Sequence, residues 1–198
     1  MPNQVMAWIA VPLLAVAATG LLLSRDWRWE LGLLAAQYLG VAVLVAQHWP
    51  LGMAAAKLVT GWMTTAALGM TLTVLPYREQ SIEEYWPQGR VFRLFMSGTI
   101  LVLAAAVTPR MEAAMAGIGA PVIAGTILLT GIGLLQLGTS QRMPRVIFGL
   151  LTVVAGFEVF YAAVESSILV AGLLAVVNLG LGLVGAYLLV AASAEDAR

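Results

Sequence analysis

Two ionisable side chains of opposite charge lie deep inside long apolar runs of the sequence. Lys57 lies within Leu51–Val74 and Glu158 within Val146–Val164, each about six residues, or about 9 Å of helix, from the end of its run. An ionisable group at that depth in a membrane costs roughly 2.5–3.5 kcal/mol on insertion scales, and therefore points to a function. We expect the two side chains to approach each other or to share a water-filled cavity, because pairing lowers the cost of burial.

Each of these charges also has a simpler interpretation. Lys57 could extend its amine along its own alkyl chain to the outer surface of the membrane. Glu158 could be a protonated carboxyl that hydrogen-bonds to a neighbouring helix. Tyr161 and Glu165 follow Glu158 at helical spacing, so one helix face carries a carboxyl, a phenol and a second carboxyl. This stripe could pass protons by way of water, or it could be a polar seam between packed helices.

Uncharged amides lie inside three further apolar runs. They are Gln37, Gln136 and Asn178. Such residues more often form hydrogen bonds between membrane helices than bind a ligand. The candidate polar axis, or proton path, comprises Glu158, Lys57, Gln37, Tyr161, Glu165 and Asn178.

The sequence carries no arrangement that indicates an enzyme. It has no cysteine and one histidine, which excludes disulfides, thiol chemistry, iron–sulfur clusters and a histidine metal site. It contains no serine–histidine–aspartate set, no phosphate loop and no pair of carboxylates with room for a substrate. Ten basic residues balance ten acidic ones without a basic face, which excludes a nucleic-acid binder. We expect no catalytic residues, no cofactor and no bound metal.

The elements that must position the polar residues are membrane-spanning helices. Of 198 residues, 61% are apolar and only 10% are charged, too few to cover a water-facing surface. A continuous run of about 20 apolar residues spans a bilayer as a helix, and the alternating pattern of a β-barrel is absent. The sequence therefore predicts an all-α, polytopic membrane helix bundle with about seven transmembrane helices. The predicted spans are Val5–Leu23, Leu31–His48, Leu51–Val74, Val91–Thr108, Glu112–Leu137, Val146–Val164 and Ser167–Ala192. The fifth span could instead begin at Pro121, because the preceding segment Met111–Ala120 is rich in alanine and glycine.

The connections between the spans predict the orientation in the membrane. The longest, Pro76–Arg90, places Ile82, Tyr85 and Trp86 on one face, which predicts a short interfacial helix. With the N-terminus outside, Arg110 is the only arginine on the outer side. We therefore expect a cytoplasmic (inner) membrane protein with its N-terminus outside and its C-terminus in the cytoplasm. The predicted inner segments hold Arg25, Arg28, Arg78, Arg90, Arg93, Arg142, Arg145 and Arg198.

A faint internal similarity relates the two ends of the chain. The second span opens with Leu31-Gly32-Leu33-Leu34 and the sixth with Phe148-Gly149-Leu150-Leu151, each just after an arginine-containing loop. The pattern predicts an N-terminal three-helix group (1–75), a loop and linking helix (76–110) and a C-terminal three-helix group (111–198). Four crossings separate corresponding helices, so the groups would be parallel repeats. Chance resemblance between apolar helices is the alternative.

Residues at the start of the sixth span resemble a known family. They are Ser140-Gln141-Arg142, then Arg145, then Ile147-Phe148-Gly149 and, further on, Gly156. This run resembles the hydrogenase-4 component E family, whose C-terminal three helices are similar to chain 4L of complex I (NuoK) and to the MrpC component of Mrp antiporters. The resemblance covers most of the chain, because Gln37 and Lys57 fit the N-terminal half of component E.

The resemblance implies a non-catalytic membrane subunit of a complex I-like or membrane-bound hydrogenase-like respiratory assembly. Such subunits bind no cofactor, adjoin antiporter-like and other membrane subunits as well as lipid, and help to carry protons along a polar axis. This chain departs from the family at the buried acids: Leu151 and Val154 occupy two of their positions, and Asn178 occupies a third. Glu158 lies on the same helix face as Leu151 and Val154.

Two other functions fit the same residues. The chain could be an independent transporter of a small solute or ion, with a site near Lys57 and Glu158 where the repeats meet. It could also be a scaffold or pigment-associated membrane protein without transport.

Overall fold

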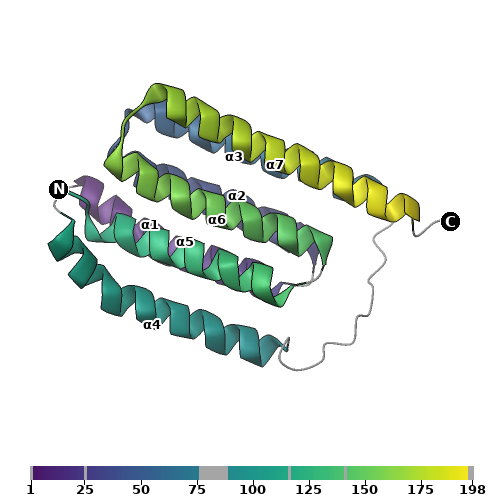
Figure 1. Ribbon diagram of the computed structural model, residues 1–198, viewed down its shortest axis with the longest axis horizontal. Helices are drawn as coiled ribbons and strands as arrows, with labels where there is room; N and C mark the ends of the chain where they lie inside the picture. The colour runs from purple at the N-terminus through teal and green to yellow at the C-terminus, as the bar shows by residue number, and fades with distance from the viewer. Residues whose placement is uncertain (1, 25, 76–88, 116, 141, 196–198) are drawn as a thin grey trace.

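The computed structural model describes residues 2–24, 26–75, 89–115, 117–140 and 142–195, in which helices joined by short connections are the only regular secondary structure (Figure 1). The predicted all-α class is thus confirmed. The segment 76–88, for which we predict an interfacial helix, lies outside the described residues. The helices are α1 (Pro2–Leu23), α2 (Trp27–Val45), α3 (Leu51–Val74), α4 (Arg90–Ala114), α5 (Ala120–Thr139), α6 (Met143–Val164) and α7 (Ile168–Glu195).

Six of these helices are long and apolar enough to cross a membrane, and α3 is the exception. Its 24 residues suffice in length, but it carries Lys57 and several threonines. The threonine hydroxyls donate to carbonyls of their own helix, as Thr64 does to Thr60 and Thr65 to Gly61, which satisfies them in an apolar setting. Lys57, Thr64 and Thr65 are buried, so this part of α3 turns its polar side chains toward the interior of the bundle.

The boundary between the fourth and fifth helices differs from the prediction. α4 continues to Ala114 and α5 begins only at Ala120, so the predicted end at Thr108 and the predicted start at Glu112 are wrong. The alternative start at Pro121 lies within one residue of the observed one. The chain reverses at Gly117, whose φ of 97° suits glycine and few other residues. The Glu112 carboxylate then accepts a hydrogen bond of 3.1 Å from the Ala120 N–H, a backbone donor that the start of α5 leaves free.

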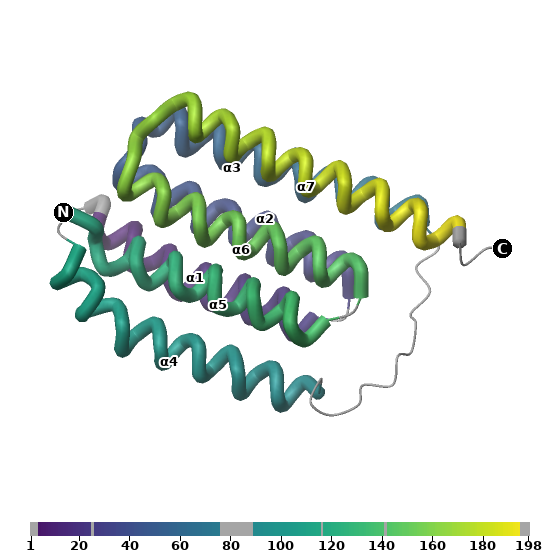
Figure 2. Tube along the Cα trace, in the orientation of Figure 1, coloured from purple at the N-terminus to yellow at the C-terminus, as the bar shows by residue number. Residues whose placement is uncertain are grey.

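The helices form two layers of three, with α4 on the outside. Helices α1, α2 and α3 make one layer and α5, α6 and α7 the other, and α4 packs mainly on α5 (Figure 1). Each helix lies beside its counterpart: α1 beside α5, α2 beside α6 and α3 beside α7 (Figure 2). Counterparts run in the same direction, as parallel repeats require. The boundaries of the three predicted segments stay a prediction.

Glycines bring the helix backbones close together where α5 meets α6. A Cβ atom added at Gly133 would lie 2.9 Å from the Val153 backbone nitrogen and 3.0 Å from the Gly149 carbonyl oxygen. One added at Gly156 would lie 2.9 Å from the Thr130 backbone nitrogen. Because neither backbone can yield easily, these positions require glycine, as is usual where membrane helices pack tightly. The tight contact fixes α6, which carries the site described below.

Candidate functional site

Lys57 and Glu158 form an ion pair inside the bundle. The Lys57 ammonium on α3 contacts the Glu158 carboxylate on α6, and the two side chains are only 6% and 3% exposed. The prediction that these charges approach each other is confirmed, and Lys57 does not extend to the membrane surface. Since α3 belongs to one layer and α6 to the other, the ion pair joins the two layers.

A second polar contact crosses the same space. The Tyr38 hydroxyl on α2 donates a hydrogen bond of 2.8 Å to Asn178 Oδ1 on α7, and both residues are fully buried. Neither α3 with α6 nor α2 with α7 packs directly in the described chain, so each contact spans a diagonal of the four-helix group α2, α3, α6 and α7. Each of these four helices therefore contributes one polar side chain to a common centre, which we call the crossed site: Tyr38, Lys57, Glu158 and Asn178.

The ring of Tyr38 connects the two diagonals. Its centroid lies 5.8 Å from Lys57 Nζ, within the range of a cation–π contact. The ring also lies so close to Gly61 on α3 that a Cβ atom there would overlap it. Gly61 thus gives Tyr38 the room to reach α7, and Tyr38 in turn lies against the charged end of Lys57.

The crossed site retains unused hydrogen-bonding capacity. Apart from the ion pair, Lys57 Nζ and the two Glu158 carboxylate oxygens have no hydrogen-bond partner among the described residues. Asn178 Nδ2 has none there either. Convergent buried donors and acceptors of this kind are what an internal water molecule needs to be bound. The site therefore holds a charge pair and keeps donor and acceptor groups that no described residue uses.

Further polar contacts extend along the interface of α2 and α6 toward the opposite end of the bundle. Gln37 Nε2 donates to Thr152 Oγ1 at 3.2 Å, and the Thr152 hydroxyl donates to the Phe148 carbonyl. Both side chains are fully buried. This contact agrees with the expectation that Gln37 bonds between helices, and it places Gln37 against α6, the helix that carries Glu158.

A second buried ion pair lies one step farther along. Arg145 Nε is 3.6 Å from Glu30 Oε1, and Arg145 Nη2 donates to the Ser24 carbonyl at 2.6 Å. Glu30 and Gln37 are seven residues apart on α2, as are Arg145 and Thr152 on α6. Glu30 contacts Arg145 and, seven residues later on both helices, Gln37 contacts Thr152. The two helices therefore run parallel, and both contacts have the same register.

The polar contacts of α6 therefore lie at three separate levels. Arg145, Thr152 and Glu158 are spaced by about 10 Å and about 9 Å along the helix axis, at 1.5 Å per residue. These steps are longer than a hydrogen bond, so a proton could pass between levels only with intervening water. We call the three levels together the polar column.

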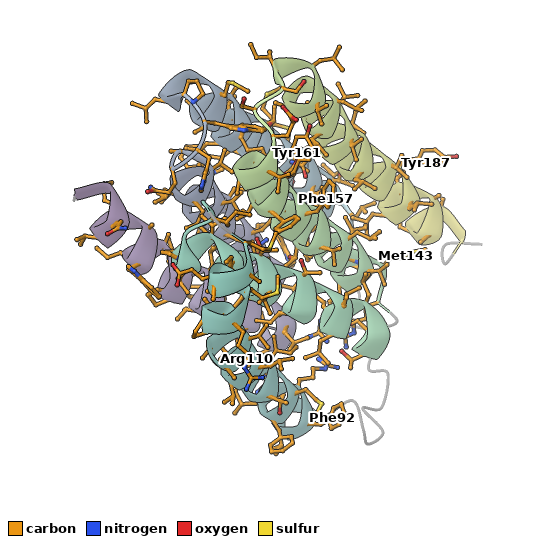
Figure 3. All side chains as sticks on the ribbon, turned by 60° about the vertical axis from the view of Figure 1, so that its left-hand side comes forward. Phe92, Arg110, Met143, Phe157, Tyr161 and Tyr187 are labelled. Carbon is orange, nitrogen blue, oxygen red and sulfur yellow. The ribbon has the colours of Figure 1, made fainter. Side chains whose placement is uncertain are left out.

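Two predicted members of the axis lie away from the column. Tyr161 is partly exposed and its ring stacks on that of Phe157, with centroids 6.2 Å apart (Figure 3). Glu165 is exposed at the C-terminal end of α6, where its carboxylate accepts from the Ser166 N–H. The structure therefore brings Lys57, Glu158, Gln37 and Asn178 into the bundle interior and leaves Tyr161 and Glu165 outside it.

Sequence reasoning missed four residues of these contacts. Tyr38 and Thr152 are ordinary in apolar helices, and Glu30 and Arg145 stand at the ends of spans, where charges usually face water. The one available signal was the seven-residue spacing shared by the α2 and α6 positions.

Within the described residues no group of three histidine or acidic side chains is placed to hold a metal ion. Comparison of the chain with models of protein families, with curated proteins and with solved structures finds no match.

Proposed function

We propose that the chain is a non-catalytic integral membrane subunit of a complex I-like or membrane-bound hydrogenase-like respiratory assembly, in which it supports or lines a path for protons. The observation that carries this proposal is the Lys57–Glu158 ion pair buried between the two helix layers. Desolvation makes a buried acid and base costly in a membrane protein, so such residues usually have a function.

The chemistry of the pair suits proton transfer. Moving one proton from the ammonium to the carboxylate converts the charged pair into a neutral one, so the site has two forms with the same net charge. A proton added to Glu158 leaves Lys57 as a cation without a counter-charge. This favours release of a proton from the Lys57 ammonium on the side away from Glu158. The hydroxyl of Tyr38 and the amides of Asn178 and Gln37 can hydrogen-bond the water that such a transfer needs.

The arrangement of the arginines supports the orientation proposed for the chain. Arg90 and Arg145 both lie beside Ser24, at the end of the bundle where α1 finishes, whereas Arg110 lies near the other end of α4. Under the positive-inside rule the Ser24 end faces the cytoplasm, with the N-terminus outside. We propose antiporter-like and other membrane proteins of the assembly as partners, in a cytoplasmic membrane.

The test uses the assembly purified from native membranes through a tag on this chain. We expect mass spectrometry to find antiporter-like proteins in stoichiometric amounts. In vesicles containing the assembly, Glu158→Gln should abolish proton uptake while leaving the set of associated proteins unchanged, because glutamine keeps the shape and loses the titratable proton.

Glu165→Gln is the matched control, since this exposed carboxylate lies at the end of the same helix. It should leave proton uptake as in the unmodified assembly. Proton pumping that persists in the Glu158→Gln assembly would contradict the role of the pair. A chain that is isolated without companions, and that moves solute by itself in vesicles, would contradict membership of an assembly and support a transporter.

A further inference from the structure

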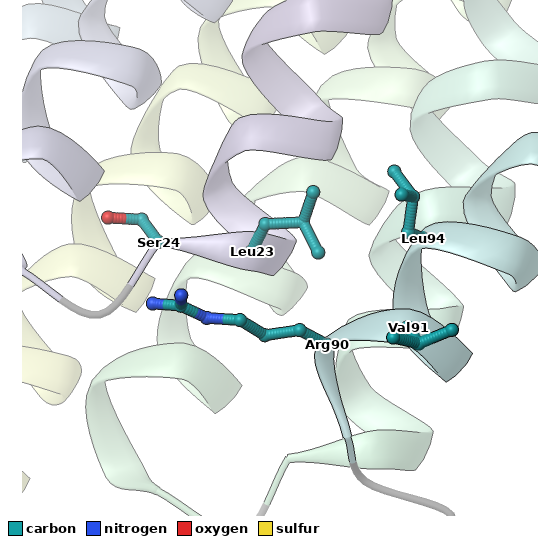
Figure 4. A pocket seen from close by; sticks show the side chains of 5 residues that line it. All are labelled: Leu23, Ser24, Arg90, Val91 and Leu94. Atoms are coloured by element: carbon teal, nitrogen blue, oxygen red, sulfur yellow. The ribbon is translucent and has the colours of Figure 1, made fainter.

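An open cleft lies between the end of α1 and the start of α4. Its volume is about 480 Å³, and it is lined by Leu23, Ser24, Arg90, Val91 and Leu94 (Figure 4). The lining has a polar part, made by the arginine and the serine, and an apolar part made by the other three side chains. The two parts adjoin at the ends of two membrane helices, the depth at which lipid head groups meet acyl chains.

Arg90 supplies a positive charge to this cleft. Its side chain is exposed and extends across the opening toward Ser24 (Figure 4). Among the described residues no carboxylate forms an ion pair with it; Glu30, on the neighbouring helix α2, pairs with Arg145. A guanidinium in this position presents several N–H donors in one plane, a geometry that suits a phosphate group.

The apolar walls narrow the choice of ligand. Val91 is 82% exposed and Leu94 is 56% exposed, so both offer uncovered hydrocarbon beside the charge. A free inorganic phosphate would leave these walls uncovered, and a neutral hydrocarbon would leave Arg90 without a counter-charge. An anionic phospholipid satisfies both parts, with its phosphate on the arginine and an acyl chain along Leu94.

A larger cavity, bounded by α1, α4 and α5, provides a contrast. It measures about 630 Å³ and lies toward the other end of α1 and α4, where Trp8, Thr108 and Glu112 are among its lining residues. Its charged group is a carboxylate, which would repel an anionic head group. The sign of the charge therefore distinguishes the two openings, and only the Arg90 cleft complements an anionic lipid.

We propose that the cleft formed by Leu23, Ser24, Arg90, Val91 and Leu94 binds an anionic phospholipid. Its polar wall is connected to the buried ion pair, because the Ser24 carbonyl accepts a hydrogen bond from Arg145. The Ser24 wall of the cleft thus lies two contacts, through Arg145, from Glu30 at the proposed cytoplasmic end of the polar column. The proposal does not depend on the function proposed above, since it rests on the cleft alone.

The experiment titrates the purified full chain in detergent with phosphatidylglycerol and, separately, with phosphatidylcholine, and counts bound lipid by native mass spectrometry. We expect phosphatidylglycerol to bind preferentially. Arg90→Gln should weaken that binding about fivefold, the change expected when one basic residue near an anionic lipid is lost. Arg90 is exposed, so the variant should fold normally.

Arg110→Gln is the matched control, since this exposed arginine lies at the far end of the same helix. It should bind phosphatidylglycerol as the unmodified chain does. Leu94→Asn should also weaken lipid binding, because it removes part of the apolar wall. Equal binding of the two lipids, an unchanged affinity in Arg90→Gln, or displacement of the lipid by millimolar inorganic phosphate would each overturn the proposal.

Discussion

Separating the two charges of the Lys57–Glu158 pair should cost far more than removing both. Because the side chains are 6% and 3% exposed, Lys57→Met leaves a buried carboxylate without its partner and Glu158→Gln leaves a buried ammonium. Loss of one member of a buried pair costs about 3–5 kcal/mol, whereas replacement of both is often close to neutral. We expect each single variant to lose about 3–5 kcal/mol of unfolding free energy and the double variant less than about 2 kcal/mol.

The assay is reversible unfolding of the purified chain in mixed micelles, applied to the unmodified chain, both single variants and the double variant. The four free energies give the coupling between the two side chains, which should be at least about 4 kcal/mol. Glu165→Gln, which changes an exposed carboxylate at the end of the same helix, should alter the unfolding free energy by no more than about 0.5 kcal/mol. Additive losses in the double variant would refute the reasoning that each charge stabilises the other.

Three more predictions concern the packing and the topology. Gly61→Ala should lower the unfolding free energy by about 1–3 kcal/mol because the new methyl group overlaps the Tyr38 ring, while Gly180→Ala, with nothing within 4 Å, should not lower it. Tyr38→Phe should lower the unfolding free energy by about 1–3 kcal/mol, since it leaves the buried amide oxygen of Asn178 without its donor. An unchanged unfolding free energy would show that this hydrogen bond does not stabilise the fold. The chain has no cysteine, so Arg110→Cys should react with an impermeant maleimide on intact cells and Arg28→Cys only after lysis, and the reverse pattern would invert the orientation.

The helices and the central ion pair were predictable from the sequence. Long apolar runs define the spans, because a bilayer demands about 20 such residues. Lys57 and Glu158 stand at similar depths in their runs, and two charges at one level of a bundle can lower their burial cost by meeting. The end of the fourth helix was not predictable in this way, because the cap that Glu112 makes on Ala120 becomes visible only when the turn at Gly117 is known.

The rest of the site depends on which helices adjoin and how each is rotated. Tyr38 gains its role because α2 and α7 stand on opposite corners of a four-helix group, a fact that no local pattern encodes. Arg145 was predicted to face the cytoplasm, and it is buried because the parallel register sets it opposite Glu30. Tyr161 shares helical spacing with Glu158 but is rotated far enough to stack on Phe157.

The crossed site has a mechanical consequence. Both of its diagonals start in the layer of α1, α2 and α3 and finish in the layer of α5, α6 and α7. Two side-chain contacts that cross between the layers oppose lateral sliding in either direction. Sliding one way lengthens the Lys57–Glu158 contact, and sliding the other way lengthens the Tyr38–Asn178 hydrogen bond. The contacts of Gln37 with Thr152 and of Glu30 with Arg145 join α2 directly to α6, and so add two further links between the layers. The contacts of the crossed site therefore resist lateral sliding of α2 and α3 against α6 and α7.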